Sequence, residues 1–302
     1  MGILQCIGNT PLVRIDGINP NPRVKVFAKL EGNNPGGSVK DRIALYMIEA
    51  AERDGKLTRD KIILEATSGN TGIGLAMVAT AKKYRVKLTM PACVSIERRR
   101  ILEAFGAELI LSPSEEGTDG AIRSAQRILS EEPETYFMPN QFDNEANVNA
   151  HYETTGKEII EQTKGEVAVL VAGMGTTGTL MGTGRRLKEF NSGITVLGVE
   201  PLLGHKIQGL KNMTESIVPK IFKPSALDEK SNVHDDDAFN TTRRLAVEEG
   251  LFVGMSSGAA MWAAMKKAKE MKDGTIVVIF PDRGDRYLST ALFTSVCAKC
   301  PP

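Results

Sequence analysis

Short apolar runs alternate with segments of helical period along most of the chain, and this alternation leaves few folds open. The runs are rich in Val, Ile and Leu and have the length of strands; they lie at 24–30, 61–66, 86–90, 107–111, 135–138, 166–172, 194–200 and 275–280. The clearest helical segments are 43–55, 72–84, 96–106, 120–132 and 261–271. Because the runs are continuous, they predict strands that are buried on both faces. Strand–helix–strand repetition in turn predicts parallel sheets covered by helices.

The number of predicted strands exceeds what one ordinary sheet holds, so the sequence predicts an α/β protein of two domains, each with a mostly parallel sheet flanked by helices. At 302 residues the chain is long enough to give each domain its own core. The stretch 201–235 breaks the alternation, and we expect either a segment that covers the substrate or a long surface excursion. Ligands of such proteins bind at the carboxyl ends of parallel strands, so functional side chains are expected in the loops that follow strands.

The charge balance excludes several classes of partner. With 38 Lys and Arg against 37 Asp and Glu, the formal net charge is +1, so we expect neither a nucleic-acid nor a membrane partner. No apolar run approaches the roughly 20 residues that cross a bilayer, and the start of the sequence lacks the pattern of a secretory signal. Four scattered cysteines suit a reducing compartment, so a cytoplasmic protein is expected.

Neither the cysteines nor the histidines predict a metal site. Cys297 and Cys300 have C-x-x-C spacing, but they lack a second pair and are interpreted as an incidental feature. The three histidines lie far apart and lack the spacing of metal ligands. We therefore expect no metal, and we interpret His151 as a structural residue whose hydrogen bonds are satisfied.

Small polar side chains gather in the loop "ATSGNTG" at 66–72, which follows a predicted strand and opens a helix. These side chains belong to Thr67, Ser68, Asn70 and Thr71. At a helix start, free backbone N–H groups and the helix dipole attract an anion. One such residue would be an ordinary N-cap, but four of them beside a glycine favour a cradle for a carboxylate.

The loop "GMGTTGT" at 173–179 also lies between a predicted strand and a helix. Its glycines match G-x-G-x-x-G, and Glu200 ends the following predicted strand, which is the context of a dinucleotide-binding fingerprint. Its three threonines favour a terminal phosphate instead, because hydroxyl donors suit the many acceptor oxygens of that group. An NAD-binding and a phosphate-binding interpretation both stay open, and either one predicts an anion at this helix start.

Lys40 lies in "EGNNPGGSVKDR", which nearly matches a P-loop. Gly32 and Gly37 have the required separation, but two further residues intervene before the lysine, so the P-loop is rejected. A lysine in the first turn of a helix opposes the dipole, which suggests a role other than helix stability. A phosphate loop, a lysine after a glycine-rich turn and a carboxylate cradle together suggest pyridoxal phosphate acting on an amino acid. A further loop, "GMSSGAA" at 254–260, predicts by itself only serine caps.

The segments "IGNTPLVRI", "KLEGNNPGGSVKDR", "EATSGNTGIGLA", "AGMGTTGTLMG", "GMSSGAA" and "DRGDRYLST" occur in the order seen in the cysteine synthases, and the resemblance runs nearly from end to end. Cysteine synthases are O-acetylserine sulfhydrylases of the tryptophan-synthase-β class (fold type II) of pyridoxal-phosphate enzymes. The resemblance implies a smaller domain at 36–145 with the substrate-carboxylate loop, and a larger domain of 1–35 plus 146–302 with the phosphate loop. It also implies an active site in the cleft between the domains and a homodimer.

Carried over residue by residue, the resemblance implies a role for each loop. Lys40 of "SVKDR" would form the Schiff base with pyridoxal 5'-phosphate, and Asn70 of "TSGNT" would hydrogen-bond its ring hydroxyl. Ser256 of "GMSSG", in preference to Ser257, would be the partner of the pyridine nitrogen. The residues expected to hold the substrate carboxylate are Thr67, Ser68, Thr71 and Gln141. Those expected to hold the phosphate are Gly175, Thr176, Thr177, Gly178 and Thr179.

These roles imply a β-replacement that converts O-acetyl-L-serine and a sulfur nucleophile into L-cysteine through an aminoacrylate intermediate, with Lys40 as the base at Cα. Two details resemble the B type of the family: Gly37, where the A type carries an aromatic residue, and "DRGDRYLST". "HKIQG" and Pro281 resemble the A type instead. We expect the Gly36–Gly37 pair to leave room for a nucleophile larger than sulfide, so thiosulfate, which would give S-sulfocysteine, is a predicted substrate.

Several alternatives stay open at the level of sequence. On the same fold they are an O-phosphoserine-dependent cysteine synthase, a cystathionine β-synthase and a serine dehydratase. Outside it they are an NAD-binding enzyme and a binding protein that has lost its activity. The intact Lys40, Asn70 and phosphate loop argue against the last of these.

Overall fold

The structure, a computed structural model, describes residues 2–67, 69–94 and 96–293. The chain divides into two compact units. Unit 1 comprises Met1–Ile7 and Asn34–Asn147, and unit 2 comprises Gly8–Asn33 and Val148–Pro302. The chain passes between the units at three points. Those at 33/34 and 147/148 each lie two residues from the predicted domain bounds, and the third, at 7/8, groups the segment up to Ile7 with the smaller unit rather than the larger.

Unit 2 contains a six-stranded sheet in the order β1-β2-β10-β7-β8-β9. Its strands are β1 (Leu12–Ile15), β2 (Val24–Leu30), β7 (Val169–Gly173), β8 (Thr195–Pro201), β9 (Glu229–Val233) and β10 (Gly274–Phe280). Neighbouring strands are parallel except β1, which runs antiparallel to β2. The loops after β7, β8 and β10 therefore all leave the sheet on the same side, at the carboxyl ends of these strands.

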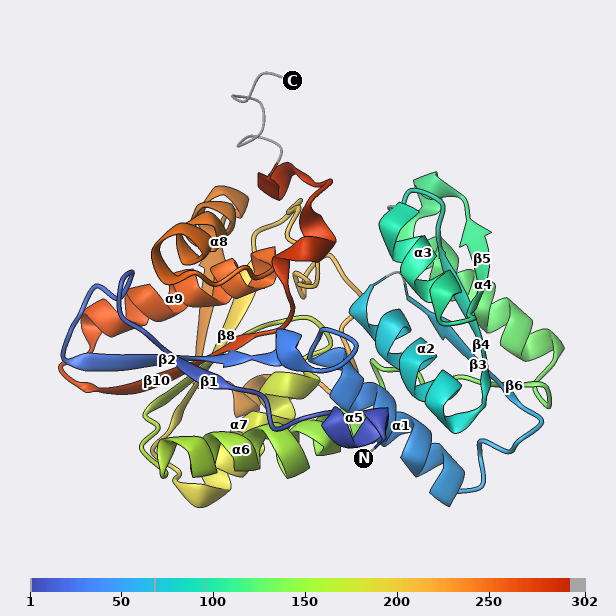
Figure 1. Ribbon diagram of the computed structural model, residues 1–302, viewed down its shortest axis with the longest axis horizontal. Helices are drawn as coiled ribbons and strands as arrows, with labels where there is room; N and C mark the ends of the chain where they lie inside the picture. Colours follow the sequence, from blue (N-terminus) through green and yellow to red (C-terminus); the bar gives the residue numbers. More distant parts are fainter. Residues whose placement is uncertain (1, 68, 95, 294–302) are drawn as a thin grey trace. The chain divides into compact units, whose positions relative to one another are not determined.

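Both faces of the unit 2 sheet are apolar, as its continuous runs predict. Along β10, Val278 packs into one core and Val277 into the other, and Val171 and Leu170 divide in the same way along β7. Figure 1 shows α8 and α9 over the first face and α6 and α7 over the second. These helices are α6 (Gly156–Thr163), α7 (Gly178–Phe190), α8 (Asp235–Glu249) and α9 (Met255–Glu270). Apolar residues are needed on both sides of the strands, which is why few polar residues interrupt them; Lys29 of β2 and Thr275 of β10 are buried exceptions.

Unit 1 contains a four-stranded parallel sheet in the order β5-β4-β3-β6. Its elements are β3 (Ile62–Ala66), β4 (Arg85–Pro91), β5 (Glu108–Ser112), β6 (Tyr136–Phe137), α1 (Lys40–Arg53), α2 (Asn70–Lys82), α3 (Ile96–Ala104) and α4 (Gly117–Glu131). Leu88 of β4 lies against Gly72 of α2, whereas Thr89 donates a hydrogen bond to the carbonyl of Ala121 in α4. Helices α2 and α4 therefore cover opposite faces of this sheet (Figure 1).

Helix α2 is a core helix that contacts the start of α1. Its residues from Thr71 to Ala79 are all buried, as expected of a helix that is apolar on every side. A Cβ on Gly74 would lie 3.0 Å from the carbonyl oxygen of Lys40, so the glycine permits a close approach of the two helices. Since Lys40 begins α1 and Asn70 begins α2, this contact brings both positions into the same part of unit 1.

The irregular stretch 201–235 contains a strand that the sequence pattern does not predict. Strand β9 pairs in parallel with β8 at the edge of the sheet. Its sequence, "EKSNV", has no apolar run because most of its residues are partly or fully exposed and only Val233 is buried. Strand β1, at the opposite edge, was missed for the same reason, because Arg14 is exposed and only Ile15 is fully buried.

Candidate active site

The glycine- and threonine-rich loop at 173–179 connects β7 to α7 in unit 2. Gly175 has no room for a side chain, because a Cβ there would lie 2.6 Å from the carbonyl oxygen of Gly209. Thr177 has a φ of 67°, in the left-handed region that β-branched residues rarely adopt. Such backbone strain persists only where the surrounding structure enforces it, and it is common at ligand-binding loops.

The Thr177 hydroxyl gives a second indication of a ligand. Thr177 is 2% exposed, and its Oγ1 has no hydrogen-bond partner within the described part of the chain. A buried hydroxyl without a partner costs about 1–3 kcal/mol, which stability alone does not explain. The loop also opens a helix of 13 residues, whose first N–H groups and dipole attract an anion.

A π-helix, His151–Thr155, supports the last residue of this loop. Nε2 of the buried His151 lies 3.2 Å from Oγ1 of Thr179, and its Nδ1 lies 2.9 Å from Oγ1 of Thr155. Both ring nitrogens have partners, which confirms that the hydrogen bonds of His151 are satisfied. Its contact with the loop was not predicted, because the two residues are 28 positions apart.

The loop at 254–257, which begins α9, lies near the same place. A Cβ on Gly209 would lie 3.9 Å from Oγ of Ser256, and the carbonyl of Gly209 is the group next to Gly175. Ser256 and Ser257 are both buried, and among the described residues nothing hydrogen-bonds Oγ of Ser257. The structure thus brings Ser256 and the glycine- and threonine-rich loop together around Gly209.

In unit 1, the predicted carboxylate loop follows β3, and the turn that carries Gln141 follows the neighbouring strand β6. Thr71 and Gln141 are both buried, and Oγ1 of Thr71 donates a hydrogen bond of 2.6 Å to Oε1 of Gln141. Because its oxygen is engaged, the Gln141 amide offers N–H donors to a ligand. Asn70 begins α2 and Thr67 precedes it in the loop, so both lie at a helix N-terminus. The predicted Ser68 lies outside the described residues.

A buried carboxylate that the sequence analysis missed, Glu65, supports the turn of Gln141. Its oxygens accept hydrogen bonds from the backbone N–H groups of Asn140, over 2.8 Å, and of Gln141, over 3.4 Å. Burial raises the pKa of the Glu65 carboxyl to about 7, although the two N–H groups act in the opposite direction. The available signal was a glutamate near the end of the otherwise apolar run "KIILEA".

The glycines that precede Lys40 have structural reasons of their own. A Cβ on Gly36 would lie 2.5 Å from Oδ1 of Asp41, whose Oδ2 accepts a hydrogen bond from the N–H of Gly36. Gly37 has a φ of 82°, which glycine adopts most easily. The expectation that Gly36 leaves room for a larger nucleophile is therefore wrong, because the Asp41 carboxylate fills that space. Lys40 itself is half-buried.

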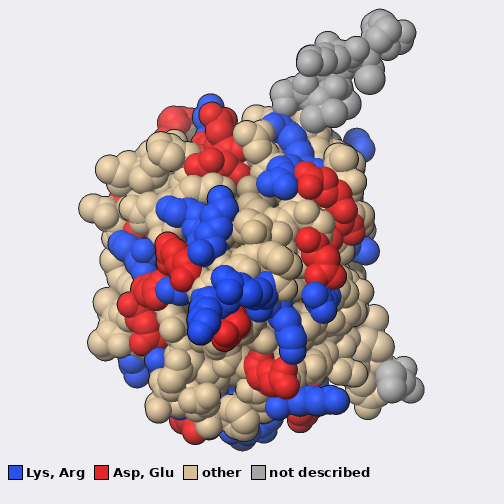
Figure 2. Space-filling view, turned by 90° about the vertical axis from the view of Figure 1, so that its left-hand side faces the viewer, with Lys and Arg blue, Asp and Glu red and all other residues tan. Residues whose placement is uncertain are grey.

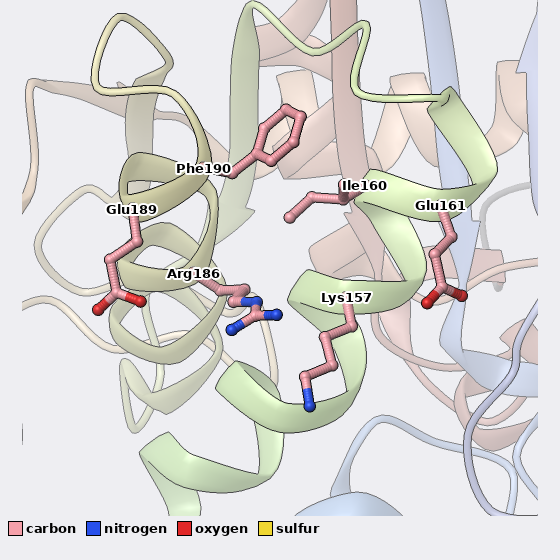
Figure 3. Close-up of a pocket in the computed structure, with 6 residues that line it drawn as sticks. All are labelled: Lys157, Ile160, Glu161, Arg186, Glu189 and Phe190. Carbon is pink, nitrogen blue, oxygen red and sulfur yellow. The ribbon is translucent and has the colours of Figure 1, made fainter.

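Other surface features involve different residues. A pocket of about 410 Å³ lies between α6 and α7, with Ile160 and Phe190 at one end and Lys157 and Arg186 at the other (Figure 3). None of its lining residues is a predicted site residue. On the face drawn in Figure 2, basic and acidic side chains are interspersed rather than separated by sign. No helix within the described ranges combines the length and the apolar character that crossing a membrane requires.

Comparison with known proteins decides among the chemistries that these loops allow. The family described as pyridoxal-phosphate dependent enzyme matches residues 3–282. The chain belongs to the pyridoxal-phosphate dependent enzymes. A cysteine synthase of Aquifex aeolicus is 49% identical over 300 residues, which cover 97% of this chain and 92% of that protein. The cysteine synthase B of Salmonella typhimurium is 47% identical over 289 residues, which cover 96% and 95%. The crystal structure of a cysteine synthase from Entamoeba histolytica has a TM-score of 0.92 at 41% identity and covers 97% of this chain and 90% of its own.

The unit 2 loops fit the phosphate of a pyridoxal-phosphate dependent enzyme. The partnerless Oγ1 of Thr177, the N–H groups at the start of α7 and the close approach at Gly175 make a small cradle of donors. The NAD interpretation needed Glu200 for a ribose hydroxyl. Glu200 is instead buried and accepts hydrogen bonds of 2.7 Å from the N–H of Met213 and from Nζ of Lys230. The family and this geometry both favour pyridoxal phosphate over NAD.

Proposed function

We propose that the protein is a cysteine synthase that forms L-cysteine and acetate from O-acetyl-L-serine and sulfide. The observation that carries the proposal is its 47–49% identity, over 96–97% of the chain, to proteins named cysteine synthase. The two polar loops support it, because one suits the phosphate of the cofactor and the other suits the carboxylate of an amino acid.

The proposed cofactor contacts are those that the resemblance to the cysteine synthases implies. The phosphate binds at Gly175–Thr179, Lys40 is the covalent anchor, Asn70 hydrogen-bonds the ring hydroxyl and Ser256 meets the pyridine nitrogen. Two contacts support this assignment: the helices that begin at Lys40 and Asn70 pack against each other, and Gly209 lies beside both Ser256 and the phosphate loop.

The carboxylate of the substrate binds at the start of α2. Thr67, Ser68, Thr71 and Gln141 are its proposed ligands. The helix N-terminus supplies N–H groups and a favourable dipole, and the Gln141 amide supplies two further donors. This end of the amino acid is fixed while its Cβ reacts.

The reaction is a replacement at Cβ. When bound, pyridoxal phosphate withdraws electrons from Cα of the amino acid and so makes its proton acidic. The neutral amine of Lys40 takes this proton and later returns it to Cα. The bond between Cβ and the acetate oxygen breaks, acetate leaves with the electron pair, and the sulfur of sulfide forms the new bond to Cβ.

Thiosulfate is a second proposed sulfur donor, which would give S-sulfocysteine and acetate. It is supported by the similarity to a cysteine synthase B and by the segment "DRGDRYLST". Gly36 does not support it, because the Asp41 carboxylate occupies the space beside that glycine. A cytoplasmic homodimer is likewise proposed from the resemblance alone, and light scattering of the purified protein tests the dimer.

A substrate matrix tests the proposed function. The purified protein is supplied with pyridoxal phosphate and assayed with O-acetylserine and O-phosphoserine, each against sulfide, thiosulfate and homocysteine. We expect cysteine from O-acetylserine and sulfide. Pyruvate as the main product would indicate a serine dehydratase, and cystathionine would indicate a cystathionine β-synthase.

Chemical trapping tests the cofactor and its anchor. Borohydride reduction followed by peptide mapping is expected to label Lys40, and the Lys40→Ala variant is expected to give no label. A protein that stays colourless and unlabelled after pyridoxal phosphate is added would contradict the proposal.

A further inference from the structure

Glu65 is a buried acid that the proposed chemistry does not use. It lies in β3, one residue before the end of the strand, and is 3% exposed. In the parallel pairing of β3 with β4 its partner is the apolar Leu88. An ionised carboxylate in such a place is costly unless other groups hydrogen-bond to it.

The groups that do so are two successive backbone N–H groups of one turn. Oε2 of Glu65 accepts from Asn140 over 2.8 Å, and Oε1 accepts from Gln141 over 3.4 Å. Each oxygen of the carboxylate thus accepts from the backbone N–H of one of two successive residues. A carboxylate can do this with both oxygens, whereas an amide has only one oxygen that accepts.

The turn needs such support. Asn140 has a φ of 50°, in the left-handed region, which asparagine adopts more readily than most residues but less readily than glycine. Asn147 also holds the turn, through a hydrogen bond of 2.7 Å from its Nδ2 to the carbonyl of Gln141. The backbone of Gln141 is therefore fixed from both sides, and its side chain is directed to Thr71.

A second glutamate in the molecule forms the same clamp with one difference. Glu158 accepts from the N–H of Asn9 over 2.9 Å and from that of Thr10 over 3.3 Å, and Asn9 has a φ of 47°. Glu158 also forms an ion pair of 2.7 Å with Lys29. Glu65 has no ion pair with any residue that the structure describes. Among the described residues, the Glu65 carboxyl is therefore held only by the N–H groups of its turn, whereas the Glu158 carboxylate is also held by a cation.

We propose that Glu65 is a positioning residue for substrate recognition, because its carboxylate fixes the Asn140–Gln141 turn and thereby aims the Gln141 amide at the carboxylate of the amino-acid substrate. The inference rests on the role proposed above for Gln141. Glu65 acts only through this turn and does not itself contact the substrate. Replacing Glu65 should therefore weaken the binding of ligands that carry a carboxylate and leave the binding of ligands that lack one unchanged.

A matched pair of ligands tests this. L-Serine and 2-aminoethanol differ by the carboxylate alone, and each is titrated into the holoenzyme while the absorbance of the bound cofactor is followed. In Glu65→Gln, which keeps the side-chain volume, we expect the Kd of L-serine to rise about tenfold, as for the loss of a hydrogen bond to a charged group. The Kd of 2-aminoethanol should change by no more than about twofold. In steady state, the KM for O-acetylserine should rise while kcat changes little.

The control is Glu158→Gln, which weakens the same kind of clamp in a turn that carries no proposed substrate residue. Both Kd values should stay within about twofold of those of the wild type. A double-variant cycle adds a second readout: in the Gln141→Ala background, Glu65→Gln should cause no further loss of L-serine affinity. If Glu65→Gln fails to fold, Glu65→Asp replaces it, with a weakening that is again confined to L-serine.

The inference is overturned if Glu65→Gln lowers the affinity for both ligands equally or for neither. It is also overturned if Glu65→Gln lowers the affinity for L-serine by the same factor in the Gln141→Ala background. Each of these outcomes leaves the proposed function intact as long as the wild type binds L-serine and turns over O-acetylserine. A wild type that does neither overturns the proposed function, and this inference with it.

Discussion

Glu65 makes the stability of the fold depend on pH in a direction that is unusual for a carboxylate. Burial raises the pKa of its carboxyl to about 7, above the ordinary value of 4.5. Between these two values the folded protein keeps a proton that the unfolded chain has lost. The free energy of unfolding therefore falls as the pH rises through this window, and this contribution is fully present only below about pH 4.5.

The size of the effect follows from the same two values. The folded-state pKa of about 7 lies about 2.5 above the ordinary 4.5, and one pKa unit corresponds to about 1.4 kcal/mol. The contribution of Glu65 to the free energy of unfolding is thus on the order of 3 kcal/mol at low pH. About 2–3 kcal/mol of it is lost between pH 5 and pH 8. No ion pair within the described residues offsets this loss.

Urea unfolding of the wild type and of Glu65→Gln between pH 5 and pH 8 measures the effect. The difference between the two proteins isolates Glu65, because the other titrating groups are common to both. We expect the wild type to lose stability relative to the variant by about 2–3 kcal/mol across this range. A difference that is constant within about 0.5 kcal/mol, or that grows in favour of the wild type with rising pH, would refute the reasoning.

Three further substitutions test the phosphate loop and the glycine-rich turn before Lys40. Thr177→Val should stabilise the apoprotein by about 1–2 kcal/mol, because it removes a partnerless buried hydroxyl. The same substitution should lower the affinity for pyridoxal phosphate about tenfold in equilibrium dialysis. A less stable apoprotein with unchanged affinity would contradict this. Gly175→Ala should lower the free energy of unfolding by about 1–3 kcal/mol in urea titrations, because its Cβ would lie 2.6 Å from the carbonyl of Gly209. Gly36→Ala should lower it by a similar amount, about 1–3 kcal/mol, because its Cβ would meet the Asp41 carboxylate, and wild-type stability would show that the carboxylate moves aside.

The core strands could be predicted from the sequence because their burial is symmetric. A strand covered by helices on both faces, such as β10, needs apolar residues at most of its positions, and such a run is recognisable without its neighbours. Edge strands do not meet this condition. The "EKSNV" of β9 pairs with β8 through its backbone, which any side chain permits, so its strand conformation depends on a partner that is distant in sequence.

Some parts of the candidate site could likewise be predicted from the sequence, and others could not. The loops at 66–72 and 173–179 could be found because their glycines and hydroxyls are adjacent in sequence and lie at the start of a helix. Glu65 and His151 could not, because each acts on a residue that is far along the chain. Glu65 holds a turn 75 residues away, and the partner of His151 in the loop is 28 residues away.

The glycines show why a residue type that is easily recognised can still be misinterpreted. Gly36 was interpreted as open space, yet the position that a side chain would take is already filled by Asp41. Gly175 lacks a side chain for a comparable reason, since the carbonyl of Gly209 lies there, whereas Gly37 is required by its positive φ. In all three cases glycine serves the packing or the backbone of its own loop. Gly36 therefore does not predict a preference for a large sulfur nucleophile, and turnover with sulfide and with thiosulfate measures which of the two the protein uses.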